Sequence, residues 1–272
     1  MDTDQKQDKY VEEVWRKYME AGDFEKELRQ RQIFKMIPGY PRCKNCYAPF
    51  SGWGSSVVRM LYGKRPSNLN PRLCNVCEEF SQKYQGGAEI ELTMLFVDVR
   101  GSTTLAEGMS PREYSSLINR FYMTASRILV ETDALIDKII GDQVAGIYTP
   151  GIAGQDHAHK AIKAAMQIMS ETGHQRTGEP WIPLGAGVHT GITFIGSVGT
   201  GDSTRDITVL GDSANTAARL SSHARVGEIL ISDDAYRRAG MQGGNTEERQ
   251  VELKGKTQSV VVHALKDYHV QV

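Results

Sequence analysis

Asp98 stands at the end of an apolar run, Leu92 to Val97, that predicts a fully buried strand. A turn of small and polar residues follows and leads toward a helix, comprising Gly101, Ser102 and Thr103. A carboxylate at the exit of a central strand, beside the backbone amides of such a turn, suits a metal-bound phosphate. A strand-end aspartate is about as often a turn or capping residue, so Asp98 alone is a weak indication.

A second carboxylate, Asp142, ends the segment KIIGD that begins at Lys138. The surrounding sequence predicts two strands, 134–140 and 144–148, with Gly141 and Asp142 at the turn between them. Gly-Asp pairs mark tight turns, so turn geometry and metal binding are both open for Asp142.

A predicted helix over residues 213–222 carries Asn215 and Arg219. Residues four apart lie on one face of a helix. An amide and a guanidinium presented together can hold a sugar and a phosphate, and they can equally form a surface pair.

All four cysteines, Cys43, Cys46, Cys74 and Cys77, form two Cys-x-x-Cys pairs with 27 residues between them. Four thiolates in this arrangement suit tetrahedral Zn²⁺, and no other cysteine competes for it. The first residues lack the layout of an export signal, which favours a metal over disulfides. A redox dithiol pair and an iron–sulfur cluster are the alternatives. We expect one structural zinc ion per chain.

Residues 31–77 contain eight basic side chains and no Asp or Glu: Arg31, Lys35, Arg42, Lys44, Arg59, Lys64, Arg65 and Arg72. Such a patch suits nucleic acid. It also suits a zinc tetrathiolate, whose roughly two negative charges nearby cations would offset. We prefer the second interpretation and do not expect nucleic acid as a partner.

Three histidines are weaker candidates. His157 and His159 stand beside Asp156 at the start of a predicted helix, 156–172, but no third metal ligand is evident. His189 lies in a glycine-rich predicted strand, 184–189, where we expect packing or a hydrogen bond rather than catalysis.

The elements that must position these residues fall into three stretches. Residues 1–35 repeat apolar positions at a helical period, and Ala21-Gly22-Asp23 divides them into two helices. Residues 36–88 are rich in Pro, Gly, Asn and Cys, lose that period and predict a loop-rich module. From about residue 90 strands and helices alternate, as in an α/β domain.

One helix of this last stretch has a well-marked start. Ser110 is the expected N-cap, Pro111 takes the first helical position and Glu113 closes a capping box. Further strands are expected at 228–232, 250–253 and 260–264.

The overall composition is that of a soluble globular protein, with 40% hydrophobic residues, 24% charged residues and a formal net charge of −1. These values argue against a disordered chain and a strongly basic nucleic-acid binder. No apolar run approaches the roughly 18 to 20 residues of a membrane span. We therefore expect a cytoplasmic protein with no membrane partner.

Four segments, FVDVRGST, DKIIGDQVAGIY, GVHTGITFIGSVG and TVLGDSANTAARL, resemble in order and spacing the catalytic domain of class III nucleotidyl cyclases, the adenylate and guanylate cyclase family. The resemblance covers about residues 89–268. It implies an α+β fold with a ferredoxin-like βαββαβ core and extra elements. The chain then divides into an N-terminal helical segment (1–35), a four-cysteine zinc-binding module (36–88) and a cyclase catalytic domain (89–272).

The resemblance also implies roles for the residues above. Asp98 and Asp142, assisted by the backbone carbonyl of Val99, would bind two Mg²⁺ or Mn²⁺ ions per active site. Those ions would lower the pKa of the ribose 3′-hydroxyl and neutralise the departing pyrophosphate. Asn215 would orient the ribose and Arg219 would stabilise charge at the α-phosphate.

The implied substrate contacts extend to both ends of the nucleotide. The turn of Gly101, Ser102 and Thr103 would contact the substrate, and Lys254 falls where the family often places a basic residue for the triphosphate. Lys256 or Arg205 could serve instead of Lys254.

Two further positions concern the base. Lys138 and Thr208 match the lysine and the threonine-or-aspartate that adenine-selective members carry, and these side chains can donate to and accept from adenine. Guanine-selective members usually carry Glu and Cys there. The same family also contains pyrimidine-nucleotide cyclases, so a pyrimidine base is an alternative.

In this family the active site forms between two catalytic domains, with the metals on one and the other substrate contacts on the second. This chain matches both sets, which implies a head-to-tail homodimer with two equivalent sites. The sequence thus predicts an adenylate cyclase that converts ATP to 3′,5′-cyclic AMP and pyrophosphate. The alternatives are a cyclase of a pyrimidine nucleotide or GTP, and a non-catalytic, zinc-dependent nucleotide-sensing or scaffold protein.

Overall fold

The computed structural model describes residues 3–174, 179–199, 205–241, 246–253, 256 and 259–266; for Thr3, Asp4, Lys138 and Ile140 we describe the backbone alone. The chain divides into two compact units. The first unit comprises Met1–Ile90, Pro150–Ile152 and Thr193–Leu210, and the second comprises Glu91–Thr149, Ala153–Ile192 and Gly211–Val272.

The described strands form one sheet in the order β2-β3-β1-β4-β6-β8-β7, with β5 paired to β4. Their bounds are β1 Gly86–Val99, β2 Leu135–Ile140, β3 Gln143–Tyr148, β4 Leu184–Gly199, β5 Arg205–Leu210, β6 Glu228–Ser232, β7 Thr246–Val251 and β8 Val260–Leu265. The strand order β2-β3-β1-β4, with the long helix α6 (Pro111–Glu131) between β1 and β2 and the long helix α8 (His157–Glu171) between β3 and β4, is the expected ferredoxin-like βαββαβ core. Strand β6 extends it in parallel to β4, and β8 and β7 follow in antiparallel pairs.

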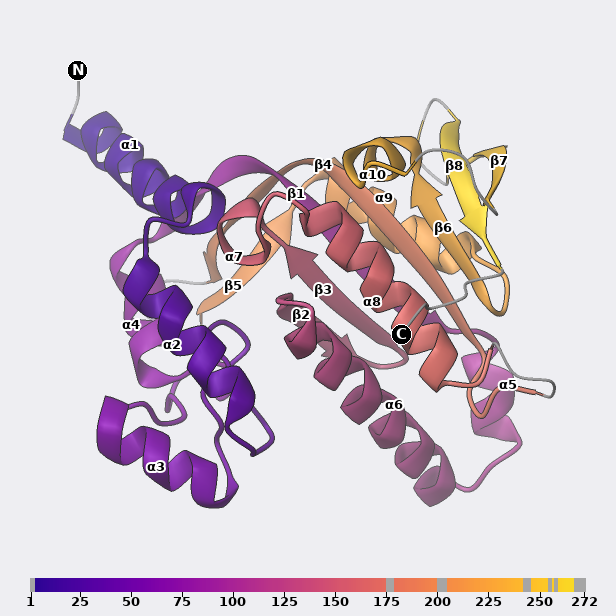
Figure 1. The fold of residues 1–272 in the computed structure, drawn as a ribbon, viewed down its shortest axis with the longest axis horizontal. Helices are drawn as coiled ribbons and strands as arrows, with labels where there is room; N and C mark the ends of the chain where they lie inside the picture. Colours follow the sequence, from indigo (N-terminus) through magenta and orange to yellow (C-terminus); the bar gives the residue numbers. More distant parts are fainter. Residues whose placement is uncertain are drawn as a thin grey trace. The chain divides into compact units, whose positions relative to one another are not determined.

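Two long helices of the second unit, α6 (Pro111–Glu131) and α8 (His157–Glu171), lie side by side on one face of the sheet (Figure 1). Helix α6 begins at the predicted capping box, since Ser110 accepts a hydrogen bond from the backbone N–H of Glu113 and the Glu113 side chain accepts one from Ser110. The shorter helices are α5 Ser102–Glu107, α7 Pro150–Ala153, α9 Asp212–His223 and α10 Asp233–Arg238. No helix in the described part of the chain is long and apolar enough to cross a membrane.

The first unit contains α1 (Thr3–Arg16), a π-helical turn at Lys17–Ala21, α2 (Glu25–Met36), α3 (Gly52–Tyr62) and α4 (Asn75–Lys83). Gly22, with φ +73°, ends the first helical stretch as predicted. Aromatic rings pack between α1 and α4: Trp15 meets Phe80 edge-on at 5.2 Å, and the Trp15 indole donates to the carbonyl of Tyr84 over 3.0 Å. This core ties the N-terminal helices to the cysteine-bearing segment.

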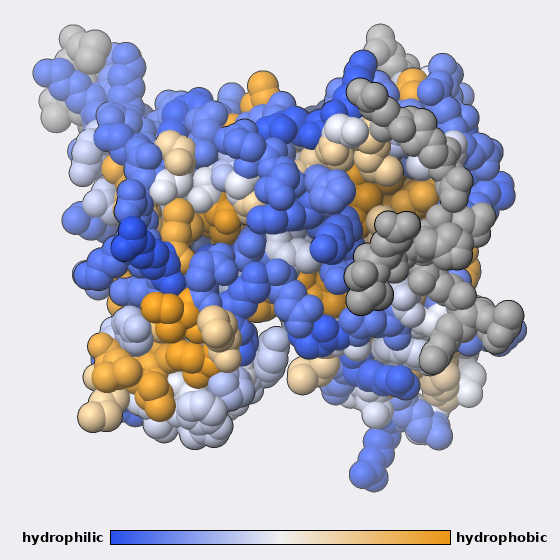
Figure 2. Space-filling model, viewed as in Figure 1, coloured by the Kyte–Doolittle hydropathy of each residue, from blue (hydrophilic) through white to orange (hydrophobic). Residues whose placement is uncertain are grey.

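The segment predicted to be loop-rich contains two helices, α3 and α4. Helix α3 buries Gly54 and Val58 but exposes most of its apolar side chains, namely Trp53, Val57, Met60 and Leu61. Figure 2 shows apolar side chains gathered over α3 and the end of α2. The helix was missed because two glycines, which are poor helix formers, stand in its first turn, and the surrounding stretch is rich in Pro, Gly and Asn.

Four strands differ from expectation. Strand β1 begins at Gly86 rather than at 92, and β4 continues to Gly199 rather than ending at 189. Strand β5 was not anticipated, because its alternation of buried and half-buried residues follows a glycine-rich stretch. Strand β7 covers Thr246–Val251 rather than 250–253; its sequence TEERQV is polar and largely exposed, so it has no apolar alternation to detect.

Candidate active site and cysteine cluster

Asp98 and Asp142 lie at the same end of two neighbouring strands. Asp98 faces Gln143 in the antiparallel pair of β1 and β3, and Asp142 immediately precedes Gln143. The backbone N–H of Val99 donates to the carbonyl oxygen of Asp142 over 3.0 Å. The Asp98 side chain is 13% exposed and Asp142 is half-buried. The structure thus brings the two predicted metal ligands together.

The turn that presents Asp142 is held by a residue that sequence reasoning missed. Gly141 has φ +64°, which favours glycine, and its carbonyl accepts a 2.5 Å hydrogen bond from the Tyr122 hydroxyl on α6. Burial raises the pKa of Tyr122, and the negative charge of Asp142 raises it further, so the phenol keeps the proton that it donates. The only signal in the sequence was the place of Tyr122 beside Phe121, at the margin of the buried face of α6.

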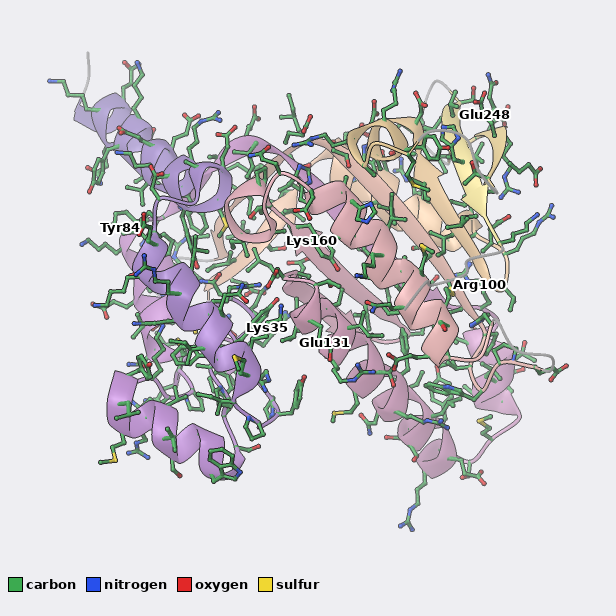
Figure 3. All side chains as sticks on the ribbon, in the orientation of Figure 1. Lys35, Tyr84, Arg100, Glu131, Lys160 and Glu248 are labelled. Atoms are coloured by element: carbon green, nitrogen blue, oxygen red, sulfur yellow. The ribbon has the colours of Figure 1, made fainter. Side chains whose placement is uncertain are left out.

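Arg100 was also missed as a site residue. Its guanidinium forms an ion pair with Asp98 and donates to the carbonyl of Ser222 over 2.6 Å (Arg100 is labelled in Figure 3). Burial lowers the pKa of Arg100, whereas the charge of Asp142 opposes that effect. The two carboxylates therefore lie in a half-buried site beside the positive charge of Arg100. Carboxylate oxygens are hard ligands that fit divalent Mg²⁺ or Mn²⁺.

The small residues after Arg100 leave room at the end of β1. Gly101 has φ +64° and stands before α5, and a Cβ atom added there would meet no other atom within 4 Å. Gly101 and Thr103 are exposed and Ser102 is half-buried. That Gly101, Ser102 and Thr103 contact the substrate stays a prediction.

Asn215 and Arg219 lie on α9 one turn apart, as predicted. Asn215 is exposed and Arg219 half-buried, and no hydrogen bond or ion pair joins either side chain to another described residue. The helix sits close against β4 because Gly187 has no side chain: a Cβ there would lie 2.3 Å from the backbone nitrogen of Ser221. Both polar groups are thus available on a rigidly seated helix.

Of the candidate basic residues, Lys256 pairs with Asp212 at the start of α9, and Lys254 lies outside the described residues. Arg205 is buried in the first unit, where it donates to the Gln85 side chain over 2.8 Å. A role of Arg205 at the triphosphate has no support from this contact.

Lys138 and Thr208 belong to different units, the second and the first respectively. Lys138 lies on β2 opposite Ala145, directly after a register shift. Thr208 lies on β5 opposite Gly196, and its buried hydroxyl has no hydrogen-bond partner among the described residues. An unsatisfied buried hydroxyl is costly, so Thr208 is suited to meet a polar group from a ligand.

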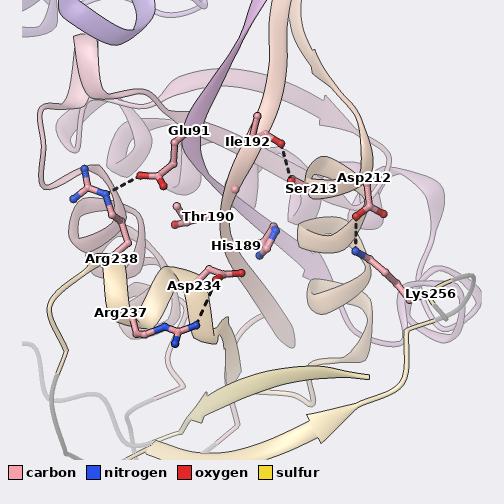
Figure 4. Close-up of a pocket in the computed structure, with 11 residues that line it drawn as sticks. Glu91, His189, Thr190, Ile192, Asp212, Ser213, Asp234, Arg237, Arg238 and Lys256 are labelled. Atoms are coloured by element: carbon pink, nitrogen blue, oxygen red, sulfur yellow. Dashed lines mark hydrogen bonds and ion pairs between the residues drawn. The ribbon is translucent and has the colours of Figure 1, made fainter. Parts of the chain in front are cut away.

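An open pocket of about 740 Å³ lies in the second unit beside β4 and the starts of α9 and α10 (Figure 4). Ion pairs line it, namely Asp212 with Lys256, Asp234 with Arg237 and Glu91 with Arg238. Its described walls include none of Asp98, Asp142, Asn215 and Arg219. We therefore do not place the substrate there.

The histidines behave as packed residues. His189, at the pocket wall, shares a 2.8 Å hydrogen bond with Ser232, and His157 shares one of 2.8 Å with Thr93. Burial lowers the pKa of each to about 4, so both are neutral near pH 7. Among the described residues the cysteines are the one group of three or more side chains close enough to hold a metal, so His157 and His159 form no such site.

The four cysteine sulfurs of the first unit all lie within 4.8 Å of one another, and the side chains are buried. Sulfurs around tetrahedral Zn²⁺ at about 2.3 Å stand about 3.8 Å apart; the sulfurs of Cys46 and Cys74 are separated by 3.6 Å. The cysteines are not disulfide-bonded. The cluster fits a tetrahedral metal ion.

The surroundings of the cluster stabilise negative sulfur. The backbone N–H of Cys74 donates to the sulfur of Cys43 over 3.3 Å, and the Asn45 amide donates to Cys77 over 3.4 Å. Burial opposes ionisation, yet hydrogen bonds among the four cysteines lower the pKa of Cys43 but raise those of Cys74 and Cys77, so these hydrogen bonds stabilise one thiolate within the cluster. Burial also disfavours the charge of Lys64, but the cysteine charges outweigh it and raise the pKa of Lys64. These contacts suit thiolates that bind a cation.

A family model described as the adenylate and guanylate cyclase catalytic domain matches residues 87–268. The chain belongs to this family. Its mixed α/β fold is that of class III cyclases: the solved adenylyl cyclase CyaB from P. aeruginosa superimposes with a TM-score of 0.59 and 26% identity, over 68% of this chain and 97% of that one.

Relatives of this cyclase-family chain carry both nucleotide names. An adenylate cyclase of Anabaena cylindrica is 29% identical over 186 residues, which is 64% of this chain and 36% of the relative. The guanylate cyclase soluble subunit beta-2 of Rattus norvegicus is 27% identical over 201 residues, 72% of this chain and 28% of the relative. The chain thus spans about a third or less of the length of these curated relatives.

Proposed function

We propose that the chain is an adenylate cyclase that converts ATP to 3′,5′-cyclic AMP and pyrophosphate. The observation that carries the proposal is the pairing of β1 with β3, which sets Asp98 and Asp142 at one end of two adjacent strands. In a member of the cyclase family, two neighbouring carboxylates at this point suit a pair of divalent cations.

The residues divide the work in a balanced reaction. The ribose 3′-oxygen forms a bond to the α-phosphorus, the bond from that phosphorus to the bridging oxygen of the β-phosphate breaks, and the 3′-hydroxyl proton passes to solvent. Asp98, Asp142 and the carbonyl of Val99 would hold Mg²⁺ or Mn²⁺, which activates the hydroxyl and neutralises pyrophosphate when bound. Asn215 orients the ribose, and Arg219 donates to the α-phosphate oxygens as their charge develops.

Adenine is the proposed base. The Thr208 hydroxyl can accept from the exocyclic amine of adenine, and the Lys138 ammonium can donate to a ring nitrogen. The support for Thr208 is its buried hydroxyl, which has no partner within the described residues. Relatives carry both names, so product analysis decides between adenine and guanine.

The proposed assembly is a head-to-tail homodimer with two shared sites. Its support is that one chain carries both halves of the machinery, the carboxylates on β1 and β3 and the polar pair on α9. In a two-fold dimer each half of one chain can meet the other half of its partner.

The cysteine cluster is proposed to bind one structural Zn²⁺ per chain. Its support is the mutual distance of the four buried sulfurs and the N–H groups that donate to them. Elemental analysis of purified protein, with Cys43→Ser as comparison, tests it: about one zinc per chain is expected, and a folded protein free of both zinc and iron would overturn it.

Product analysis tests the catalytic proposal. The purified chain is incubated with Mn²⁺ and equal concentrations of ATP, GTP, CTP and UTP, and products are separated and identified by mass. Cyclic AMP should dominate and disappear in Asp98→Ala, while Glu131→Gln, a change in an exposed ion pair of α6, should retain it. Another cyclic nucleotide as main product would overturn the base assignment, and no product would favour a nucleotide-sensing protein.

A further inference from the structure

Asp206 on β5 accepts hydrogen bonds from two basic side chains, one beside each cysteine pair. The Lys44 ammonium donates to one carboxylate oxygen of Asp206 over 2.9 Å, and Arg72 donates to the other over 3.2 Å. Lys44 stands between Cys43 and Cys46, and Arg72 stands two residues before Cys74. The first unit contains all these residues.

The ion pair between Lys44 and Asp206 is mostly buried. The Lys44 side chain is 5% exposed and that of Asp206 is 27% exposed. The backbone N–H of Lys44 also donates to the carbonyl of Arg72 over 2.9 Å, and this hydrogen bond connects the segments that carry the two cysteine pairs. A charge pair in such a position is strong only while its geometry is kept, since a displaced partner leaves a buried charge unsatisfied.

Asp206 and its neighbours on the strand have further contacts with the same module, and the Asn70 amide also donates to Asp206 over 3.4 Å. Strand β5 pairs with β4, and its neighbour Arg205 is fixed by Asn70, whose amide donates to the Arg205 carbonyl over 2.8 Å, and by Gln85. Asn70 and Gln85 flank the second cysteine pair. The cysteine module therefore supplies the side-chain contacts at the start of β5.

Thr208 is two residues beyond Asp206 and shares its face of the strand, because side chains alternate along a strand. The alternation is visible in burial: Arg205, Ile207 and Val209 are buried, while Asp206 and Thr208 are half-buried. A displacement of Asp206 thus moves the face that carries the proposed base-contacting hydroxyl.

We propose that Asp206 is a positioning residue that couples the metal state of the cysteine cluster to the placement of Thr208. Metal bound at Cys43, Cys46, Cys74 and Cys77 keeps Lys44 and Arg72 in the positions from which they donate hydrogen bonds to Asp206. The inference rests on the proposed zinc binding and on the proposed role of Thr208. The cluster is then a regulatory site for nucleotide recognition as well as a structural one.

Coupling of this kind acts in both directions. If bound metal stabilises the position of β5, then an intact contact at Asp206 must stabilise bound metal by the same free energy. The coupling can therefore be measured at the metal, without any turnover.

The first test is the rate of zinc release. Full-length wild type and Asp206→Asn are mixed with excess chelator, and released zinc is followed by a colorimetric indicator. Release should be about ten times faster from Asp206→Asn, as for other residues that support metal ligands. Asp133→Asn, which breaks a comparable half-buried pair with Lys160 in the second unit, is the matched control and should release zinc at the wild-type rate.

The second test follows β5 directly. Hydrogen exchange of peptides containing residues 205–210 is compared with and without chelator. Removing zinc should accelerate exchange in wild type, and Asp206→Asn should exchange fast in both conditions, while peptides from β6 stay unchanged. Slow exchange in wild type after zinc removal would overturn the coupling.

The third test separates positioning from simple stability. Asp206→Asn should raise KM for ATP several-fold more than it lowers kcat, and Asp206→Glu should restore part of the loss. If Asp206→Asn lowers both kcat and the free energy of unfolding but leaves KM for ATP unchanged, the contact is merely structural and the proposal is overturned.

The failures are distinguishable. Protein that contains no metal removes the zinc proposal itself. Protein with zinc but identical release and exchange in wild type and Asp206→Asn removes only the coupling. Altered release and exchange with an unchanged KM for ATP would remove only the link to Thr208. Protein that makes no cyclic nucleotide would overturn the proposed function, while release and exchange would still test the coupling.

Discussion

The backbone N–H of Val99 lies 3.0 Å from the carbonyl oxygen of Asp142, and this hydrogen bond joins the two strand ends that carry Asp98 and Asp142. Because it involves backbone atoms alone, it does not require either carboxylate. Replacing a carboxylate should therefore leave the strand ends in place, and the effect of the change reports on the carboxylate itself.

Asp142→Asn should lower turnover of ATP with Mn²⁺ by about 1,000-fold, since a divalent ion contributes several kcal/mol to the transition state. The melting temperature should stay close to that of wild type. Initial rates and thermal unfolding are measured together. Asp156→Asn, an exposed acid beside α8, is the control, and turnover of Asp142→Asn within tenfold of wild type would exclude Asp142 as an essential ligand.

The ion pair between Arg100 and Asp98 should compete with metal binding. Arg100→Met keeps much of the aliphatic stem but removes the charge, so the Mn²⁺ concentration for half-maximal turnover should fall about fivefold, which corresponds to about 1 kcal/mol. Direct Mn²⁺ binding to the nucleotide-free protein should tighten by a similar factor. Arg127→Met, which breaks exposed pairs on α6, should change neither quantity; weaker Mn²⁺ binding by Arg100→Met would show that Arg100 supports the metal site instead.

Shared sites predict complementation between two inactive chains. Asp98→Ala lacks a metal ligand and Arg219→Ala lacks the α-phosphate donor, so a mixed dimer of the two retains one intact site of two. Random pairing makes about half of the dimers mixed, and coexpression should recover about a quarter of wild-type turnover.

The matched control for complementation is Asp98→Ala with Asp142→Ala. Both changes fall in the same half of the site, so no mixed dimer can assemble an intact one. If mass spectrometry shows dimers that contain one Asp98→Ala chain and one Arg219→Ala chain, and these dimers are inactive, the shared-site model is wrong.

Much of the catalytic fold could be predicted because most of its elements have a local signal. Ser110 and Glu113 mark the start of α6 through a capping box, and the apolar run before Asp98 marks a buried strand. The proximity of Asp98 and Asp142 follows once the hairpin of β2 and β3 pairs with β1. Asn215 and Arg219 share a helix face by spacing alone.

The parts that escaped prediction depend on contacts between distant residues. Nothing local in Asp206 indicates its pairing with Lys44, 162 residues earlier in the chain. Arg100 sits inside a recognised motif, but its pairing with Asp98 depends on how the turn folds back beside Ser222. Helix α3 was missed for a different reason, because two glycines in its first turn and the Pro, Gly and Asn residues around it predict a loop.

Acid should destabilise the second unit through its buried histidines. Burial lowers the pKa of His157 to about 4, whereas histidine in the unfolded chain titrates near 6.5. Between these values the unfolded chain binds more protons than the folded one, so the free energy of unfolding falls as pH falls. From pH 7.5 to 5.0 this residue alone should cost about 2 kcal/mol.

Urea unfolding at the two pH values measures this loss, and the comparison with His157→Gln isolates it from the carboxylates that also titrate. The glutamine amide can still share a hydrogen bond with Thr93 but gains no proton, so the variant should lose about 2 kcal/mol less stability than wild type on acidification. His159→Gln, at an exposed position two residues away, should keep the wild-type pH dependence. An equal loss in His157→Gln and wild type would mean that His157 is not held neutral in the folded chain.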